Sequence, residues 1–271
     1  MKRREYVLSS EELSFALAFC RHDGLASSVL KESTGEVAEE GIELILQTAS
    51  RSLFSKGILL NLVEERPDKA FTEGFKDLLD DLASSNNMFR AYNENENGQF
   101  VLTSHSSRNG FIFHIVSNQI IHVLCEMELN DMIEEITAFF QPRFNSWDSL
   151  QFSMEEENFQ SFIQALQSKK PIEPGLAAEQ FASDYYENEG NIVNFSLIRT
   201  EDDGLPSFLE VVLLLTGKEH TWTITEEHFD GKKTIIIKTL HKIEWDELLK
   251  KVLSSMATNQ ISLIKEYKVK T

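Results

Sequence analysis

Cysteine is scarce in this sequence of 271 residues. Cys20 and Cys125 are the only two, and no C-x-x-C pair occurs. A disulfide framework or a cysteine-ligated zinc site needs more thiols at closer spacing, so both are excluded. Two isolated thiols inside apolar stretches suit a reducing compartment, and the sequence therefore predicts a cytoplasmic protein.

Long apolar runs are also missing. The longest, residues 15–20 and 211–215, fall far short of the roughly 20 apolar residues that a membrane-spanning helix needs. The first four residues, Met1–Arg4, are basic at three positions, but residues 5–12 contain no apolar core of a signal peptide. We therefore expect neither membrane insertion nor export.

Basic side chains are outnumbered by acidic ones. The sequence has 26 Lys and Arg against 44 Asp and Glu, which gives a formal net charge of −18. Such a charge repels the phosphates of nucleic acids and the headgroups of anionic lipids. Because 41% of the residues are hydrophobic, the chain can still build a core. We expect a globular protein that binds neither nucleic acids nor membranes.

Motifs of common enzymes and metal sites are absent as well. The sequence has no GxGxxG, GxxxxGK[ST], GxSxG or HExxH pattern, and no two of its seven histidines are four residues apart. Paired carboxylates such as Glu11–Glu12 fall at predicted helix starts or on polar faces. His114 and His122 lie in strand patterns, which leaves a metal site built from separate strands as the lesser alternative. We predict no catalytic residue, no metal and no cofactor.

Apolar periodicity predicts helices followed by strands in the first half of the chain. Helical spacing covers three segments: 10–19, 37–54 and 68–83. Ser9 ahead of Glu11 and Glu12 is typical of a capped helix start. Strand-like alternation, with Asn-Gly steps at 97–98 and 109–110, covers four segments: 89–92, 99–104, 110–117 and 118–124. A helix capped by Asn130 and Asp131 follows.

The second half repeats this order of elements. Helices are predicted after Ser153 and over 177–186, strands over 192–200, 208–215, 220–225 and 234–239, and a last helix is predicted to be capped by Asp246. Three short matches keep the same order in both halves: Ser9–Phe15 with Ser153–Phe159, Gly24–Ala26 with Gly175–Ala177, and Leu129–Ile133 with Trp245–Leu249. We expect an α+β fold from an internal duplication, with halves 1–141 and 142–271. The alternative is one domain of two ordinary helix-and-sheet segments.

A strand late in the sequence is the candidate partner-binding surface. Alternation places His220, Trp222 and Ile224 on one face and three threonines on the other. Tryptophan is enriched among residues that dominate binding energy. We nominate these three residues, together with Phe208 and Val212 of the preceding strand, as the surface that binds a partner. The alternative is that Trp222 belongs to the core.

Four features carry a family resemblance: the opening Tyr6–Leu13, the helix that leads into Arg51–Leu59, the strand Gly110–Ile115, and the repeated second half. On these features the chain resembles the EspG family, cytosolic chaperones associated with bacterial ESX (type VII) secretion. The resemblance implies two quasi-twofold-related α+β halves, each an antiparallel sheet with packed helices. It also implies a non-catalytic chaperone or adaptor that binds a helical secretion substrate, such as a WXG- or LXG-like protein, and keeps it soluble.

Two other functions stay open at this stage. An immunity protein could use the charge of −18 to block a basic toxin. A small hydrolase or transferase could assemble its site only in three dimensions, without a motif that the sequence displays.

Overall fold

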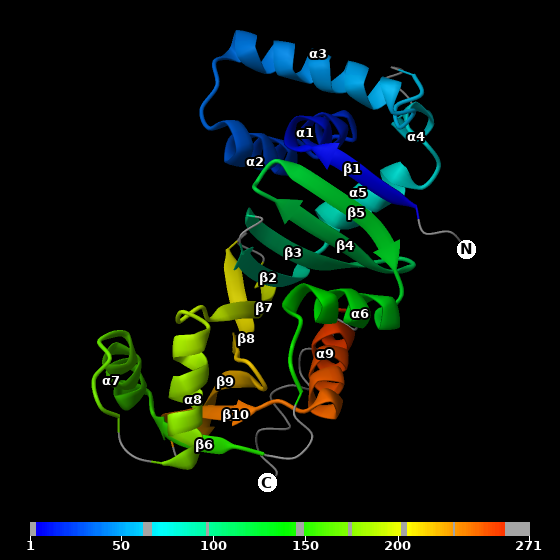
Figure 1. The fold of residues 1–271 in the computed structure, drawn as a ribbon. Coiled ribbons are helices and arrows are strands. Elements are labelled where there is room, and N and C mark those ends of the chain that lie inside the picture. The colour runs from blue at the N-terminus through cyan, green and yellow to red at the C-terminus, as the bar shows by residue number, and fades with distance from the viewer. Residues whose placement is uncertain are drawn as a thin grey trace.

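Figure 1 shows the computed structural model of the chain, which describes residues 4–61, 67–95, 98–144, 149–172, 175–201, 205–229 and 231–257. Ten strands form one sheet, and every neighbouring pair of strands is antiparallel. Helices pack on both faces of this sheet. The α+β fold class is therefore confirmed.

The first half of the chain runs from an edge strand through helices to a four-stranded meander. Its helices are α1 (Ser10–Phe19), α2 (Asp23–Thr34), α3 (Glu39–Ser55), α4 (Pro67–Ala70), α5 (Phe75–Ser84) and α6 (Leu129–Phe140). Its strands are β1 (Glu5–Ser9), β2 (Asn87–Asn95), β3 (Gly98–Ser107), β4 (Gly110–Ser117) and β5 (Ile121–Met127).

The second half follows the same sequence of elements with fewer helices. Its helices are α7 (Glu156–Gln167), α8 (Leu176–Glu187) and α9 (Lys242–Ala257). Its strands are β6 (Gln151–Glu155), β7 (Val193–Thr200), β8 (Pro206–Thr216), β9 (Thr221–Phe229) and β10 (Lys232–Thr239).

Each half contributes five strands, and their order is the same when each half is followed from its outer edge. The first half reads β1-β5-β4-β3-β2 and the second reads β6-β10-β9-β8-β7, with β2 and β7 paired in the middle. This shared order supports a duplication, and the quasi-twofold relation of 1–141 to 142–271 stays a proposal. Superposition of the halves tests it: we expect α6 to coincide with α9, and a different helix placement would contradict it.

The predicted start of the first helix is confirmed. The Ser9 hydroxyl accepts a hydrogen bond from the Glu12 amide, and the Glu12 carboxylate accepts one from the Ser9 amide at 2.7 Å. This reciprocal capping satisfies amides that the first helical turn leaves free. The helix ends where Arg21 adopts a φ of 68°.

Several predicted boundaries are wrong. The single helix expected over 68–83 divides into α4 and α5, because Phe71 pairs with Leu59 in a β-bridge and Gly74 adopts a left-handed φ of 80°. The strand expected to begin at Asn118 begins at Ile121, since Asn118 and Gln119 have φ angles of 51° and 61° and form a turn. The helices α6 and α9 begin before their expected caps, at Leu129 and Lys242. Asn97 of the expected Asn-Gly turn lies outside the described residues.

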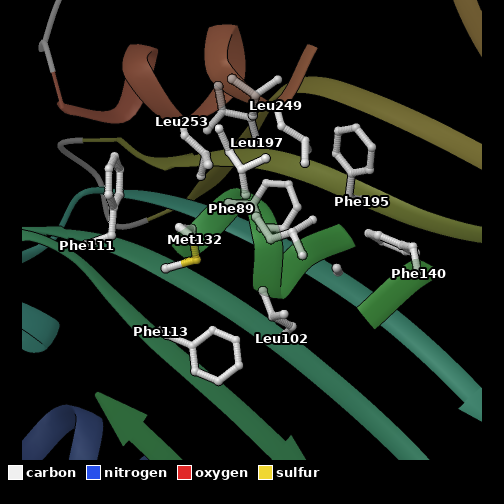
Figure 2. Close-up of a cluster of buried hydrophobic side chains, with 14 of the residues drawn as sticks. Phe89, Leu102, Phe111, Phe113, Met132, Phe140, Phe195, Leu197, Leu249 and Leu253 are labelled. Carbon is white, nitrogen blue, oxygen red and sulfur yellow. The ribbon is translucent and has the colours of Figure 1, made fainter. Parts of the chain in front are cut away.

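Three buried cores divide the two faces of the sheet. The central core fills one face, where α6 and α9 cover the middle strands, and Figure 2 shows Phe89, Phe195 and Leu249 meeting there. The opposite face carries two end cores: one lies under α1 and α5, the other under α7 and α8. Between these end cores, the middle of the opposite face presents the exposed side chains Arg90, Phe208 and Val211.

Candidate functional site

Four of the five nominated partner-binding residues are buried. Trp222 and Val212 are 0% exposed, Ile224 is 3% exposed and His220 is 6% exposed, whereas Phe208 is 61% exposed. Val212 belongs to the central core, and Trp222 and Ile224 belong to the end core under α7 and α8. The expected surface is therefore wrong for these four residues. Alternation correctly separated the two faces of β9. In β8, Phe208 and Val212 lie on opposite faces, because the register of β8 with β7 shifts between Leu197 and Ile198.

Trp222 anchors that end core through packing and one buried polar contact. Its ring lies 5.4 Å from the ring of Phe181 on α8, measured between centroids, in an edge-to-face arrangement. Its indole Nε1 donates a hydrogen bond of 2.7 Å to Oδ2 of Asp184, a carboxylate that is 2% exposed. His220 Nδ1 lies 3.8 Å from the same oxygen. The alternative reading of Trp222, as a core residue, is the one that the structure supports.

Phe208 instead marks a different surface, which we name the central face. Strand register aligns residues in rows across β2, β7 and β8, so that aligned side chains point to the same side. The rows are Met88–Ile198–Phe208, Arg90–Ser196–Val211 and Tyr92–Asn194–Leu213. These nine residues point away from the central core, since Phe89, Phe195 and Val212 alternate with them.

The central face combines exposed apolar side chains with one cation. Phe208 is 61% exposed and Val211 is 45% exposed. Arg90, which is also exposed, occupies the same row as Val211. Exposed apolar groups on the same sheet face as a guanidinium are typical of a protein-binding surface, where Arg and aromatic residues are enriched. The sequence offered one signal for it, the nomination of Phe208.

A cavity of about 390 Å³ opens where the first-half end of the central face meets α1 and α2. Its apolar wall includes Leu17 of α1 and Val29 of α2, and its polar wall includes three histidines. These are His105, His114 and His122, which come from β3, β4 and β5. Sequence reasoning noted two of the three and had no means to place them together.

A cysteine nucleophile and a metal site are two other candidates for chemistry in this protein. Cys20 is a buried free thiol, and burial raises its pKa to about 11, which leaves almost no nucleophilic thiolate near neutral pH. Among the described residues no hydrogen bond joins Cys20 to His22, whose Nε2 lies 2.9 Å from Oδ1 of Asp80. Across the described ranges, no group of three or more His, Cys, Asp or Glu side chains could hold a metal ion.

Membrane insertion was not expected from the sequence. In the part of the chain that the structure describes, none of the helices is both long and apolar enough to cross a bilayer.

Among solved structures, the fold is similar to that of the Mycobacterium tuberculosis type VII secretion system chaperone EspG5, whose structure was determined in complex with a PE25-PPE41 dimer. The TM-score is 0.61 and the sequence identity is 11%, over 93% of this chain and 96% of that chain. At this identity the likeness shows a shared fold.

Comparisons of the sequence identify a family but no activity. A search among curated proteins finds no match. A family model described as "Uncharacterised protein YfjC" matches residues 8–253, which is most of the chain. The chain therefore belongs to the YfjC family.

Proposed function

We propose that this protein is a non-catalytic chaperone or adaptor that binds a helical secreted protein, of the kind exported by a type VII system, through its central face. The observation that carries the proposal is the shared fold with EspG5, which extends over nearly the full length of both chains. That chaperone is seen in complex with a PE25-PPE41 dimer. The two buried thiols suit action in the cytoplasm, before export of the partner.

The chemistry of the central face suits an amphipathic helix. Phe208 and Val211 form an exposed apolar patch on β8, which can cover the apolar side of a helix that would otherwise aggregate. Arg90 on the same face can pair with a carboxylate on the partner. Carboxylates elsewhere on this protein, with its net charge of −18, keep the complex dispersed in water.

The Phe208→Ser variant tests the central face. We expect it to fold as the wild type does, because the side chain is 61% exposed, and to bind the partner about 30-fold more weakly, which corresponds to about 2 kcal/mol lost at a binding hot spot. The measurement is a titration of the purified protein with individual small helical secreted proteins of its host, with complex stoichiometry from light scattering.

Ile243→Ser is the matched control. Ile243 is 73% exposed at the start of α9, and α9 covers the other face of the sheet. The variant therefore removes an exposed apolar side chain, as Phe208→Ser does, but away from the central face, and it should leave binding unchanged. Equal affinity of the two variants would overturn the assignment of the central face. If no secreted helical protein binds the wild type, the chaperone proposal itself is wrong.

A further inference from the structure

A continuous chain of polar side chains runs from the first residue of α1 through three strands of the first half. Ser10 Oγ lies 2.9 Å from His122 Nε2, and His122 Nδ1 lies 2.8 Å from His114 Nε2. His114 Nδ1 lies 3.3 Å from the hydroxyl of Thr103, which lies 3.2 Å from His105 Nε2. We call these five residues the relay. No sequence motif announces it, since its members come from four separate elements.

The Ser10 end of the relay determines the direction of its hydrogen bonds. The Ser10 hydroxyl lies 3.0 Å from the carbonyl oxygen of Gln119 and 3.2 Å from that of Ile120. Because a carbonyl can only accept, the hydroxyl proton belongs there, and Ser10 Oγ accepts from His122 Nε2–H. The Nδ1 atom of His122 then carries no proton and is an acceptor.

The same direction follows along the rest of the relay. His114 donates from Nε2 to His122 and accepts at Nδ1 from the Thr103 hydroxyl, which accepts from His105 Nε2. The relay ends at His105 Nδ1, a buried atom with no hydrogen-bond partner among the described residues. With the hydrogen bonds in this direction, His105 Nδ1 carries a lone pair and no proton. The reverse direction would place a buried N–H there without an acceptor. Each imidazole is thus neutral and protonated at Nε2.

Extra protons are disfavoured along the relay. The facing nitrogens of His114 and His122 lie 2.8 Å apart and have room for one proton between them, so the two rings cannot both be imidazolium ions. Burial also lowers the pKa of His105 and of His122 to about 4. Burial lowers the pKa of His114 well below its usual value, and the charges of His122 and His105 add to the effect.

Some charged groups around the relay favour protonation of its histidines, and others oppose it. Glu11 on α1 counteracts part of the shift by raising the pKa of His122. Glu32 of α2 lines the same cavity and also favours protonation, while Arg90 of β2 opposes it. Tyr92, the other titratable group that lines the cavity from β2, is neutral near pH 7. Burial outweighs the two carboxylates, so the relay stays neutral at physiological pH.

We propose that the relay is an acid-sensitive latch, which holds the start of α1 against β5 while its imidazoles are neutral and releases that contact when they take up protons. Leu13 and Leu17 of α1 form part of the cavity wall, so release of α1 opens the cavity to water. The latch concerns the first half of the chain and does not depend on the proposed partner.

Nitrogen NMR of the histidine side chains in the full-length protein tests the arrangement. At pH 7 we expect His105, His114 and His122 all to be neutral with the proton on Nε2, and to stay neutral down to about pH 5. An Nδ1–H tautomer at His122, or an imidazolium ion at any of the three positions at pH 7, would overturn the relay.

Hydrogen exchange between pH 7 and pH 4.5 tests the release. Histidines that are exposed by opening bind protons below about pH 6.5, whereas the buried histidines of the closed state do not until about pH 4. The stability of the closed state is therefore complete above about pH 6.5 and is lost as the pH falls toward 4. Three protons taken up together increase the opening constant of α1 by as much as about 1,000-fold per pH unit. We expect α1 amides to open before those of β9 and β10. Simultaneous opening of both regions would contradict a local latch.

His122→Gln separates the latch from a general effect of acid. Glutamine keeps hydrogen-bonding groups but does not titrate, so opening of the variant takes up one proton fewer. The factor by which the opening constant grows per pH unit should therefore be about ten times smaller than in the wild type. His228→Gln is the control, because His228 has an exposed side chain outside the relay and its removal should leave the slope unchanged. Should His122→Gln fail to fold, His105→Gln at the end of the relay gives the same comparison. A slope equal to that of the wild type would overturn the proposal.

Discussion

Trp222→Ala is expected to lower the free energy of unfolding by about 4 kcal/mol, the range for removing a large buried aromatic side chain. The indole is 0% exposed and packs edge-to-face against Phe181 and Phe152. Its removal also leaves the carboxylate of Asp184 without its 2.7 Å donor, in a site that is 2% exposed. Both losses act in the same direction, and chemical denaturation followed by circular dichroism measures their sum.

Trp222→Phe divides this loss into its two parts. The phenyl ring keeps most of the packing and removes only the donor to Asp184, so we expect a loss of about 2 kcal/mol, as for a hydrogen bond to a charged group. Phe208→Ala, on the exposed central face, should change stability by less than about 0.5 kcal/mol. If Trp222→Ala instead kept wild-type stability and lost only partner binding, the assignment of Trp222 to the core would be wrong.

The second large effect is expected at Glu12, where Glu12→Ala should cost about 3 kcal/mol, the upper range for hydrogen bonds to a charged group. This carboxylate is 3% exposed and joins three elements. It accepts hydrogen bonds from Lys56 Nζ at 2.7 Å, from Ser52 Oγ at 2.6 Å and from the Ser9 amide at 2.7 Å. Its loss leaves the end of α3 without its polar attachment to the start of α1. Urea unfolding measures the change.

The ionised state of Glu12 makes this effect dependent on pH. Burial alone raises the pKa of Glu12, but the hydrogen bonds from Lys56, Ser52 and the Ser9 amide outweigh it and hold the pKa below its usual value. The stabilisation is therefore complete above the unfolded pKa of about 4.3 and is lost as the pH falls through the folded value. Glu11→Ala, one residue earlier on α1, is the control and should cost less than about 1 kcal/mol. Equal costs for the two variants would contradict the role of Glu12.

Local chemistry explains which elements could be predicted. The helix over 10–19 and the strand over 110–117 have the bounds that the sequence predicted, because a capping serine and an Asn-Gly step are short-range signals. The edge strands β1 and β6 were missed. Each has only five residues directly before a helix, and each is a strand because a distant one, β5 or β10, pairs with it. The helix α2 was missed because it has a single acidic residue in its first turn and no side-chain cap.

The location of the candidate site could not be predicted, because it depends on which strand faces are covered by helices. Phe208 and Trp222 have the same kind of sequence context, an aromatic residue in an alternating strand, yet one is 61% exposed and the other 0%. The helix that covers Trp222, α8, lies some 40 residues earlier in the sequence. Periodicity reports that two faces differ and contains no information about which distant helix packs on either of them.

The sequence by itself determined the α+β class, the repeated order of helices and strands, and the absence of common catalytic motifs, because each depends on composition or on neighbours within a few residues. Only the tertiary structure decided the central face, the buried contact of Trp222 with Asp184, and the relay. These features join residues that are far apart in the chain, as Ser10 is from His122. Such contacts form when strands align in register and helices cover them, and that alignment is a property of the folded chain as a whole.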